Sequence, residues 1–175
     1  MTHTWTNTTA RLIHTQTYEH MVYVRPHLQY CSSAWSPYSV ADKELLESVQ
    51  KRAVKMITNL SGTYEEKLSE LGLQTLEENR IRGDMVEMYK LLTVKTNVDF
   101  RQFFTLATPR LGAGNTRGNT GYLNVEEPSF AKGDVRRFFF TQRCPRVWNA
   151  LPDSVKKSAT VNSFKAAYDN FKKTS

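Results

Sequence analysis

The sequence predicts an all-α protein, and three observations lead to that prediction. Apolar residues recur at steps of three and four along several segments, which is the spacing of one face of a helix. Two Thr-x-x-Glu capping boxes, at Thr63 and Thr75, each open such a segment. No segment of useful length alternates apolar and polar residues as a half-buried strand would. The predicted architecture is a kinked helix plus a helical cluster, then a long Gly-rich connector and a C-terminal basic two-helix hairpin.

The chain begins with a predicted tail and a helix that contains a proline. Residues 1–17 hold seven threonines and little periodicity, so we expect a loosely ordered tail. A helical stripe then extends over residues 18–35 and comprises Met21, Val24, Leu28, Cys31 and Trp35. Pro26 lies inside this stripe, where a proline costs about 3 kcal/mol. Burying each large apolar side chain yields about 1.5–3 kcal/mol, so we expect the helix to continue through Pro26 with a kink.

The next predicted helix separates apolar side chains from cations. Asp42 is a suitable N-cap for it. Lys51 and Lys55 lie on one side, with Arg52 at the edge. The opposite side is apolar and comprises Leu45, Leu46, Val49, Ala53, Met56 and Ile57. This helix is therefore predicted to be amphipathic, with a basic face.

The two capping boxes define the rest of the helical cluster. The box that starts at Thr63 opens a short helix, which Gly72 ends. The box that starts at Thr75 opens a longer helix. Its apolar stripe comprises Ile81, Met85, Met88, Tyr89 and Leu92. With the preceding helices, it completes a predicted thumb-like cluster over residues 18–93.

Residues 94–133 are predicted to form a connector loop. Five of the eight glycines and two of the six prolines fall between Thr93 and Gly133. The one helical spacing in this stretch is that of Phe100, Phe103 and Phe104, which predicts a short helix near Phe103. A loose connector of this length is uncommon within a compact domain, so it indicates either a functional loop or two semi-independent halves.

The C-terminal region, residues 134–175, is predicted to contain two helices. The first starts at Asp134, has Pro145 inside it and ends at Pro152. Its apolar stripe comprises Phe140, Cys144, Val147 and Leu151. The second starts near Thr160, and one of its faces comprises Val161, Phe164, Tyr168 and Phe171. Both patterns are typical of amphipathic helices that share a core.

Positive charge is concentrated in the last eighty residues. The net charge of the chain is +7, and residues 96–175 hold thirteen basic and six acidic side chains. Such asymmetry favours a polyanionic partner, most often a nucleic acid. The alternative interpretation is a solvated basic surface that has no partner.

Nine basic residues are the candidate nucleic-acid contacts. They would hold the phosphates of RNA or of an RNA–DNA duplex without reading its sequence. These residues are Lys51, Arg52, Lys55, Arg136, Arg137, Arg143, Arg146, Lys156 and Lys157. Three phenylalanines and a tryptophan interleave with the later arginines, and such sets can also stack on bases. The helical spacing of these aromatic residues favours a place in the core instead.

No pattern typical of catalysis or metal binding is found in the sequence. The four histidines lie within the first 27 residues and lack the spacing of a helical metal site. The glycine-rich run at 112–118 lacks the Lys-Ser/Thr pair of a phosphate-binding loop. We therefore expect no enzymatic activity, no metal and no cofactor. Cys31 and Cys144 are too few for a disulfide framework, and both are predicted to be buried thiols.

The sequence contains no apolar run as long as a membrane span and no signal-peptide pattern. We therefore expect an intracellular protein without a membrane partner. The sequence does not distinguish between nucleus and cytoplasm.

Several motifs that follow one another in order resemble one known family. They are Val24-Arg25-Pro26-His27-Leu28, the Leu71-Gly72-Leu73 turn, the Arg80–Tyr89 stretch with its RGDM, and Trp148-Asn149-x-Leu151-Pro152. Over about residues 21–171, the chain resembles the region downstream of the polymerase core in reverse transcriptases of non-LTR retrotransposons, the jockey-like LINE elements.

This resemblance implies that the parent enzyme is an RNA-directed DNA polymerase. The family's Tyr/Phe-x-Asp-Asp catalytic motif is absent, because no two adjacent aspartates occur in the chain. We therefore expect a non-catalytic fragment that helps to hold template and primer for a polymerase core of palm and fingers. Two alternatives stay open: a helical protein-interaction or scaffold module, and a relic fragment with no activity of its own.

Overall fold

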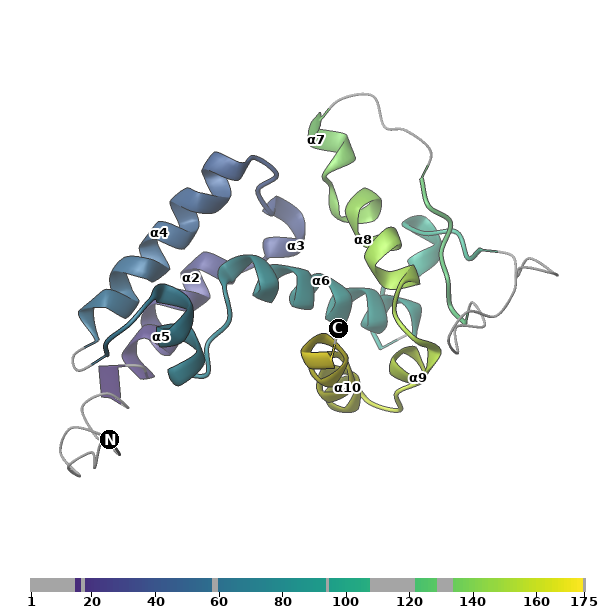
Figure 1. The fold of residues 1–175 in the computed structure, drawn as a ribbon. Coiled ribbons are helices and arrows are strands. Elements are labelled where there is room, and N and C mark those ends of the chain that lie inside the picture. The colour runs from purple at the N-terminus through teal and green to yellow at the C-terminus, as the bar shows by residue number, and fades with distance from the viewer. Residues whose placement is uncertain are drawn as a thin grey trace. The chain divides into compact units, whose positions relative to one another are not determined.

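The fold is that of a computed structural model, which describes residues 15–16, 18–57, 60–93, 95–107, 122–128 and 134–174. Within these residues the regular structure is helical, and the all-α prediction is confirmed. The chain divides into two compact units (Figure 1). The first contains Met1–Ser32 and Ser36–Arg80, and the second contains Ser33–Trp35 and Ile81–Ser175. The division thus falls between Arg80 and Ile81, not in the predicted connector.

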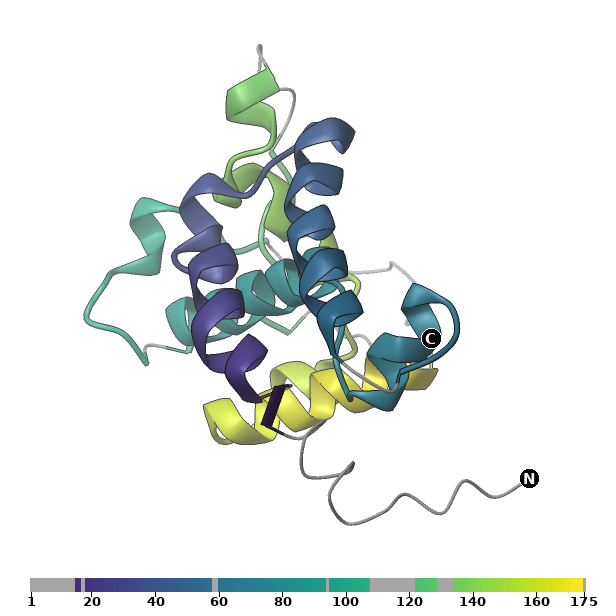
Figure 2. The same cartoon turned by 90° about the vertical axis from the view of Figure 1, so that its left-hand side faces the viewer.

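The first unit is built around a long amphipathic helix. Its elements are η1 (His20–Val24), α2 (Arg25–Gln29), α4 (Val40–Met56), α5 (Tyr64–Glu70) and the first residues of α6 (Leu76–Leu92). Helix α4 contacts both η1 and α5, and Figure 2 shows it running alongside η1 and α2. The buried core of this unit is formed by Val54, Leu68 and Leu73, with Tyr64 and Leu71 packed against them.

The chain is helical on both sides of Pro26, but the helix ends earlier than predicted. Pro26 lies in the first turn of α2. The turn before it, η1, is π-helical. The chain then breaks at Cys31, whose φ of 54° is left-handed, and α3 (Ser32–Trp35) follows. The predicted continuous helix to Trp35 is therefore wrong, and Cys31 is exposed instead of buried.

Both predicted capping boxes are present. The Thr63 hydroxyl accepts a hydrogen bond from the Glu66 N–H, and the Glu66 carboxylate accepts one from the Thr63 N–H. Thr75 and Glu78 exchange the same pair of bonds at the start of α6. Gly72 ends α5 at a φ of +64°, and the Leu73 N–H donates back to the carbonyl of Leu68. Together with the bond from the Gly72 N–H to the Ser69 carbonyl, this bond forms a Schellman motif, which accounts for the Leu-Gly-Leu turn.

Helix α4 begins three residues before its predicted start, and its buried face only partly matches the predicted one. Its N-cap is Ser39, and Asp42 lies in the first turn. The buried face comprises Gln50, Val54 and Ile57, whereas Leu45 and Met56 are 65% and 78% exposed. The Gln50 amide donates to the Tyr64 hydroxyl at 2.9 Å and to the carbonyl of Gln74 at 3.1 Å. The buried face therefore includes a polar side chain that the predicted apolar face did not contain.

The second unit has the larger core. Its elements are Ser33–Trp35 of α3, the remainder of α6, η2 (Phe100–Gln102), α7 (Asp134–Arg137), α8 (Phe140–Asn149), α9 (Asp153–Lys156) and α10 (Val161–Thr174). Tyr89 of α6 stacks on Phe164 of α10 with ring centroids 4.5 Å apart, and Trp148 of α8 stacks on Phe164 at 5.9 Å. The predicted stripes of α6 and α10 are confirmed at Met85, Met88, Tyr89, Leu92, Phe164 and Tyr168, all of which are buried.

The region predicted as a two-helix hairpin contains four helical segments. Helix α7 is separate from α8, and α9 was not predicted. Pro145 lies inside α8, as predicted. The core residue of this helix is Trp148, with an exposed fraction of 0%, and the predicted Val147 is at the surface. Cys144 is buried as predicted, and this burial raises the pKa of its thiol far above the ordinary value.

Part of the predicted connector is ordered against α8. Leu106 and Val125 form an isolated antiparallel β-bridge. The Val125 N–H donates to Oδ1 of Asn149 at 3.0 Å, and Nδ2 of Asn149 donates to the Val125 carbonyl at 2.8 Å. The indole N–H of Trp148 donates to the Leu123 carbonyl at 2.8 Å. Residues 122–128 are thus held through their main chain. The glycine-rich run at 112–118 lies outside the described residues, and so does the predicted tail apart from Thr15 and Gln16.

Candidate nucleic-acid interface

Three of the nine candidate cations lie together near the end of α4. Lys51, Arg52 and Lys55 are all exposed. Lys51 and Lys55 are four residues apart and share a face of the helix. Nζ of Lys51 lies 5.3 Å from the ring centroid of Tyr64. Among the described side chains, no carboxylate forms an ion pair with any of the three, so their charge is available to solvent or to a ligand.

A second group of cations, in the second unit, lies on α7 and α8. Arg136 and Arg137 occupy the last turn of α7, and Arg146 is in the last turn of α8. All three side chains are exposed. The guanidinium of Arg137 lies 5.6 Å from the ring centroid of Phe138. As on α4, none of them is paired with a carboxylate among the side chains that are described.

Lys157 is exposed beside an aromatic ring. Its Nζ lies 5.2 Å from the ring centroid of Tyr122 and 3.9 Å from a carboxylate oxygen of Asp153. The side chain of Lys157 is half exposed, so the contact with Asp153 is weak and screened by solvent. Its charge therefore stays available to solvent or to a ligand.

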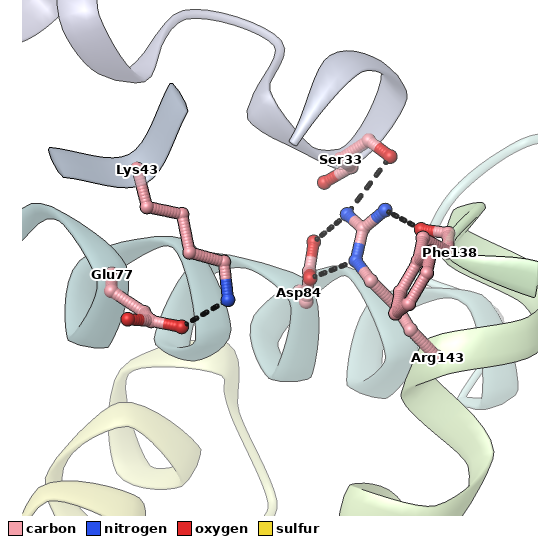
Figure 3. A network of polar contacts seen from close by, with 6 residues as sticks. All are labelled: Ser33, Lys43, Glu77, Asp84, Phe138 and Arg143. Carbon is pink, nitrogen blue, oxygen red and sulfur yellow. Dashed lines mark hydrogen bonds and ion pairs between the residues drawn. The ribbon is translucent and has the colours of Figure 1, made fainter. Parts of the chain in front are cut away.

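Arg143 is committed to the protein itself. Its Nε and Nη2 donate to the two carboxylate oxygens of Asp84 at 2.9 and 3.0 Å. Nη2 also donates to the carbonyl of Ser33 at 3.1 Å, and Nη1 donates to the carbonyl of Phe138 at 2.9 Å (Figure 3). The side chains of Arg143 and Asp84 are only 19% and 6% exposed. All these acceptors lie within the second unit. The guanidinium of Arg143 is therefore engaged in intramolecular hydrogen bonds and is not available to a phosphate, so we leave Arg143 out of the candidate interface.

The other ion pair drawn in Figure 3 differs in character. Lys43 and Glu77 are 2.6 Å apart, both in the first unit, with side chains 33% and 49% exposed. Such surface pairs contribute about 0–1 kcal/mol to stability. The buried pair makes Arg143 a structural residue, whereas Lys43, in an exposed pair, keeps access to solvent.

Lys156 is also turned inward. The residue is 1% exposed, and its ammonium donates to Oδ1 of Asn124 at 2.6 Å and to the carbonyl of Asn149 at 3.3 Å. It lies 5.8 Å from the ring centroid of Trp148. Burial lowers the pKa of Lys156 to about 8, against an opposing effect from the Asp153 carboxylate. Because the ammonium has no access to a phosphate here, Lys156 also leaves the candidate interface.

The acidic groups of the second unit's helices are largely occupied. Asp84 is paired with Arg143, and Asp169 is paired with Arg82 through two bonds of 2.6 and 2.7 Å. The hydrogen bonds to Asp169 raise the pKa of Arg82. Asp153 is buried. These three carboxylates therefore form no ion pair with the exposed cations of α7 and α8, and their one contact with Lys157 is the 3.9 Å pair from Asp153.

Other exposed groups of the second unit were not among the predicted contacts. Lys172 and Lys173 are exposed in the last turn of α10, and their adjacency in the sequence was an available signal. Phe139 is 47% exposed although its spacing favoured the core. No signal in the sequence indicated this exposure, because three consecutive phenylalanines, Phe138, Phe139 and Phe140, lie in three different environments.

No group of three or more His, Cys, Asp or Glu side chains that could hold a metal ion occurs among the described residues. Within the same residues, no helix combines the length and apolar character needed to cross a bilayer. Comparisons of the chain with models of protein families, with curated proteins and with solved structures found no match.

Proposed function

We propose that this protein is a non-catalytic module that holds nucleic acid by its phosphate backbone. The observation that carries the proposal is the sorting of cations on the second unit. Arg136, Arg137, Arg146 and Lys157 are exposed, while the carboxylates of Asp84 and Asp153 are paired or buried. Exposed cations of this kind attract polyanions without sequence readout.

The α4 cations extend the proposal to the first unit. Lys51, Arg52 and Lys55 are exposed on α4, and Lys55 lies in its last turn, where the macrodipole favours positive charge. The resemblance to the region downstream of a reverse transcriptase core supports the same ligand class, a template–primer duplex. In that context the module would stabilise the duplex while a separate catalytic core performs synthesis.

The test is a salt titration of binding to an RNA–DNA duplex. If five of the seven exposed cations engage phosphates, log affinity falls against log salt with a slope of about −4 to −5. The doubles Lys51→Gln/Lys55→Gln and Arg136→Gln/Arg137→Gln each reduce the magnitude of the slope by about 2. The double Lys43→Gln/Lys90→Gln removes the same charge from lysines in ion pairs and leaves the slope unchanged. A flat salt dependence, or no binding at 50 mM salt, contradicts the proposal.

One observation favours a second candidate function, a protein-interaction module. Large apolar side chains are exposed along α4, and they include Val40, Leu45 and Met56. Exposed apolar surface of this kind is typical of protein contacts when it is contiguous over a few hundred Å². Sedimentation velocity over a range of concentrations tests this candidate: self-association that Leu45→Glu abolishes supports it, and a monomer at all concentrations contradicts self-association through α4.

A further inference from the structure

The junction between α7 and α8 presents an exposed aromatic ring next to two exposed arginines. Phe139 is the N-cap residue of α8, with an extended backbone, and its exposed fraction is 47%. Arg136 and Arg137 precede it by three and two residues and are also exposed. The Phe139 N–H donates to the Arg136 carbonyl at 3.2 Å. The three side chains therefore belong to one tight turn.

This turn is fixed on both sides of Phe139. On one side, the Phe138 carbonyl accepts the Nη1 bond of Arg143, whose other donors bind Asp84 and Ser33 (Figure 3). On the other side, Phe140 is buried and meets Phe104 edge to face at 5.9 Å. The exposure of Phe139 is thus a consequence of fixed neighbours. Arg143, which does not face the ligand, acts here as a positioning residue.

The chemistry of the turn indicates what it would bind. An exposed phenylalanine ring can stack on the face of a base, whatever the base, while neighbouring cations contact the flanking phosphates. In a double helix the base faces are already stacked on one another and are not accessible. The N-terminal end of α8 adds positive partial charge beside the ring, which further favours phosphate.

We propose that Phe139 stacks on an unpaired base of a single-stranded nucleic acid whose flanking phosphates contact Arg136 and Arg137. This inference rests on the proposed function, because it assigns a strand form to the ligand of the same basic surface. It adds that the second unit distinguishes bases that are free to stack from those held inside a duplex.

The experiment compares two single strands with the same number of phosphates, a 12-nucleotide oligodeoxyadenylate and its fully abasic counterpart. Binding of the full chain is measured by fluorescence anisotropy. Phe139→Leu weakens binding to the base-containing strand by about 5- to 100-fold, leaves binding to the abasic strand unchanged, and leaves binding to the RNA–DNA duplex unchanged. Phe139→Trp retains the affinity of the natural residue.

Phe103→Leu is the matched control, because Phe103 is a similarly exposed ring, at 44%, at the C-cap of η2. It leaves all affinities unchanged. Equal losses on the base-containing and abasic strands, or no loss on either, overturn the assignment of Phe139. If Arg136→Gln/Arg137→Gln still weakens duplex binding in that case, the proposed function stands without this inference. If the unaltered chain binds no strand and no duplex, both fail.

Discussion

Arg143 and Asp84 form a two-point ion pair between α8 and α6, with N–O distances of 2.9 and 3.0 Å. The same guanidinium holds the carbonyls of Ser33 and Phe138. A single side chain thus connects three segments of the second unit that are far apart in sequence. Only arginine offers enough donors in a rigid fork for this arrangement, so the pair is a structural centre of the unit.

Removing the carboxylate should leave a buried, uncompensated guanidinium. We expect Asp84→Ala to lower the free energy of unfolding by about 3–5 kcal/mol, measured by urea denaturation. Glu87→Ala removes an exposed ion pair with Lys90 from the same helix and should cost less than about 1 kcal/mol. Equal effects of the two substitutions would show that the Asp84 pair contributes no more than a surface pair.

The Asn149 amide should determine the order of the segment around Val125. Asn149→Ala removes both the donor to the Val125 carbonyl and the acceptor for the Val125 N–H. We expect a loss of about 1–3 kcal/mol and faster hydrogen exchange at the Val125 amide. Asn170→Ala, an exposed position on α10, should change stability by less than about 0.5 kcal/mol. Unchanged exchange at Val125 in the Asn149 variant would contradict the assigned role.

Lys156 should make stability rise with pH. Its pKa is lowered to about 8 in the folded protein, from an ordinary value of 10.5, because of burial. Between these values the unfolded chain binds more protons, so the free energy of unfolding increases with pH, by about 1–3 kcal/mol in total. Below pH 8 both states are protonated, and the cost of burying the charge is fully present.

Other groups oppose this trend. Burial raises the pKa values of Cys144 and Tyr168, so their protons stay bound in the folded state and stability falls as pH rises past their ordinary values. The difference in unfolding free energy between the natural chain and Lys156→Met, measured at pH 7 and pH 10, isolates the lysine. That difference should shift in favour of the natural chain at pH 10. A difference independent of pH would contradict a lowered pKa.

Two glycines should respond to alanine in opposite directions. A Cβ at Gly72 would meet no atom within 4 Å, but its φ of +64° is left-handed. Gly72→Ala should therefore cost about 1–2 kcal/mol through the backbone alone. A Cβ at Gly83, inside α6, also meets nothing, and Gly83→Ala should stabilise by about 0.5–1 kcal/mol. Thermal unfolding of both variants tests the pair, and the same sign of shift in both would contradict the backbone argument.

Local features of the fold could be predicted from the sequence. The two capping boxes and the Gly72 terminus depend on residues within a few positions of one another, and all are present. The apolar stripes of α6 and α10 could also be read from the sequence, because little interrupts the helical spacing of apolar residues in these two segments. The break at Cys31 gave no signal, because a non-glycine residue there adopts a positive φ.

Long-range contacts explain what sequence patterns missed. Gln50 is buried because its partners Tyr64 and Gln74 come from other segments. The nine cations could be identified from the sequence, but their environments could not. Arg143 meets a carboxylate 59 residues away, and Lys156 meets an amide 32 residues away. Sorting structural cations from available ones therefore required the three-dimensional arrangement.

The attachment of residues 122–128 has a consequence for divergence among related chains. Trp148 and Asn149 bind carbonyl and amide groups of Leu123 and Val125, which nearly every residue type supplies. The outward-facing positions of that segment can accumulate substitutions freely while the Trp-Asn dipeptide cannot. Distant homologues should then keep the dipeptide long after the segment that it binds has lost all recognisable similarity.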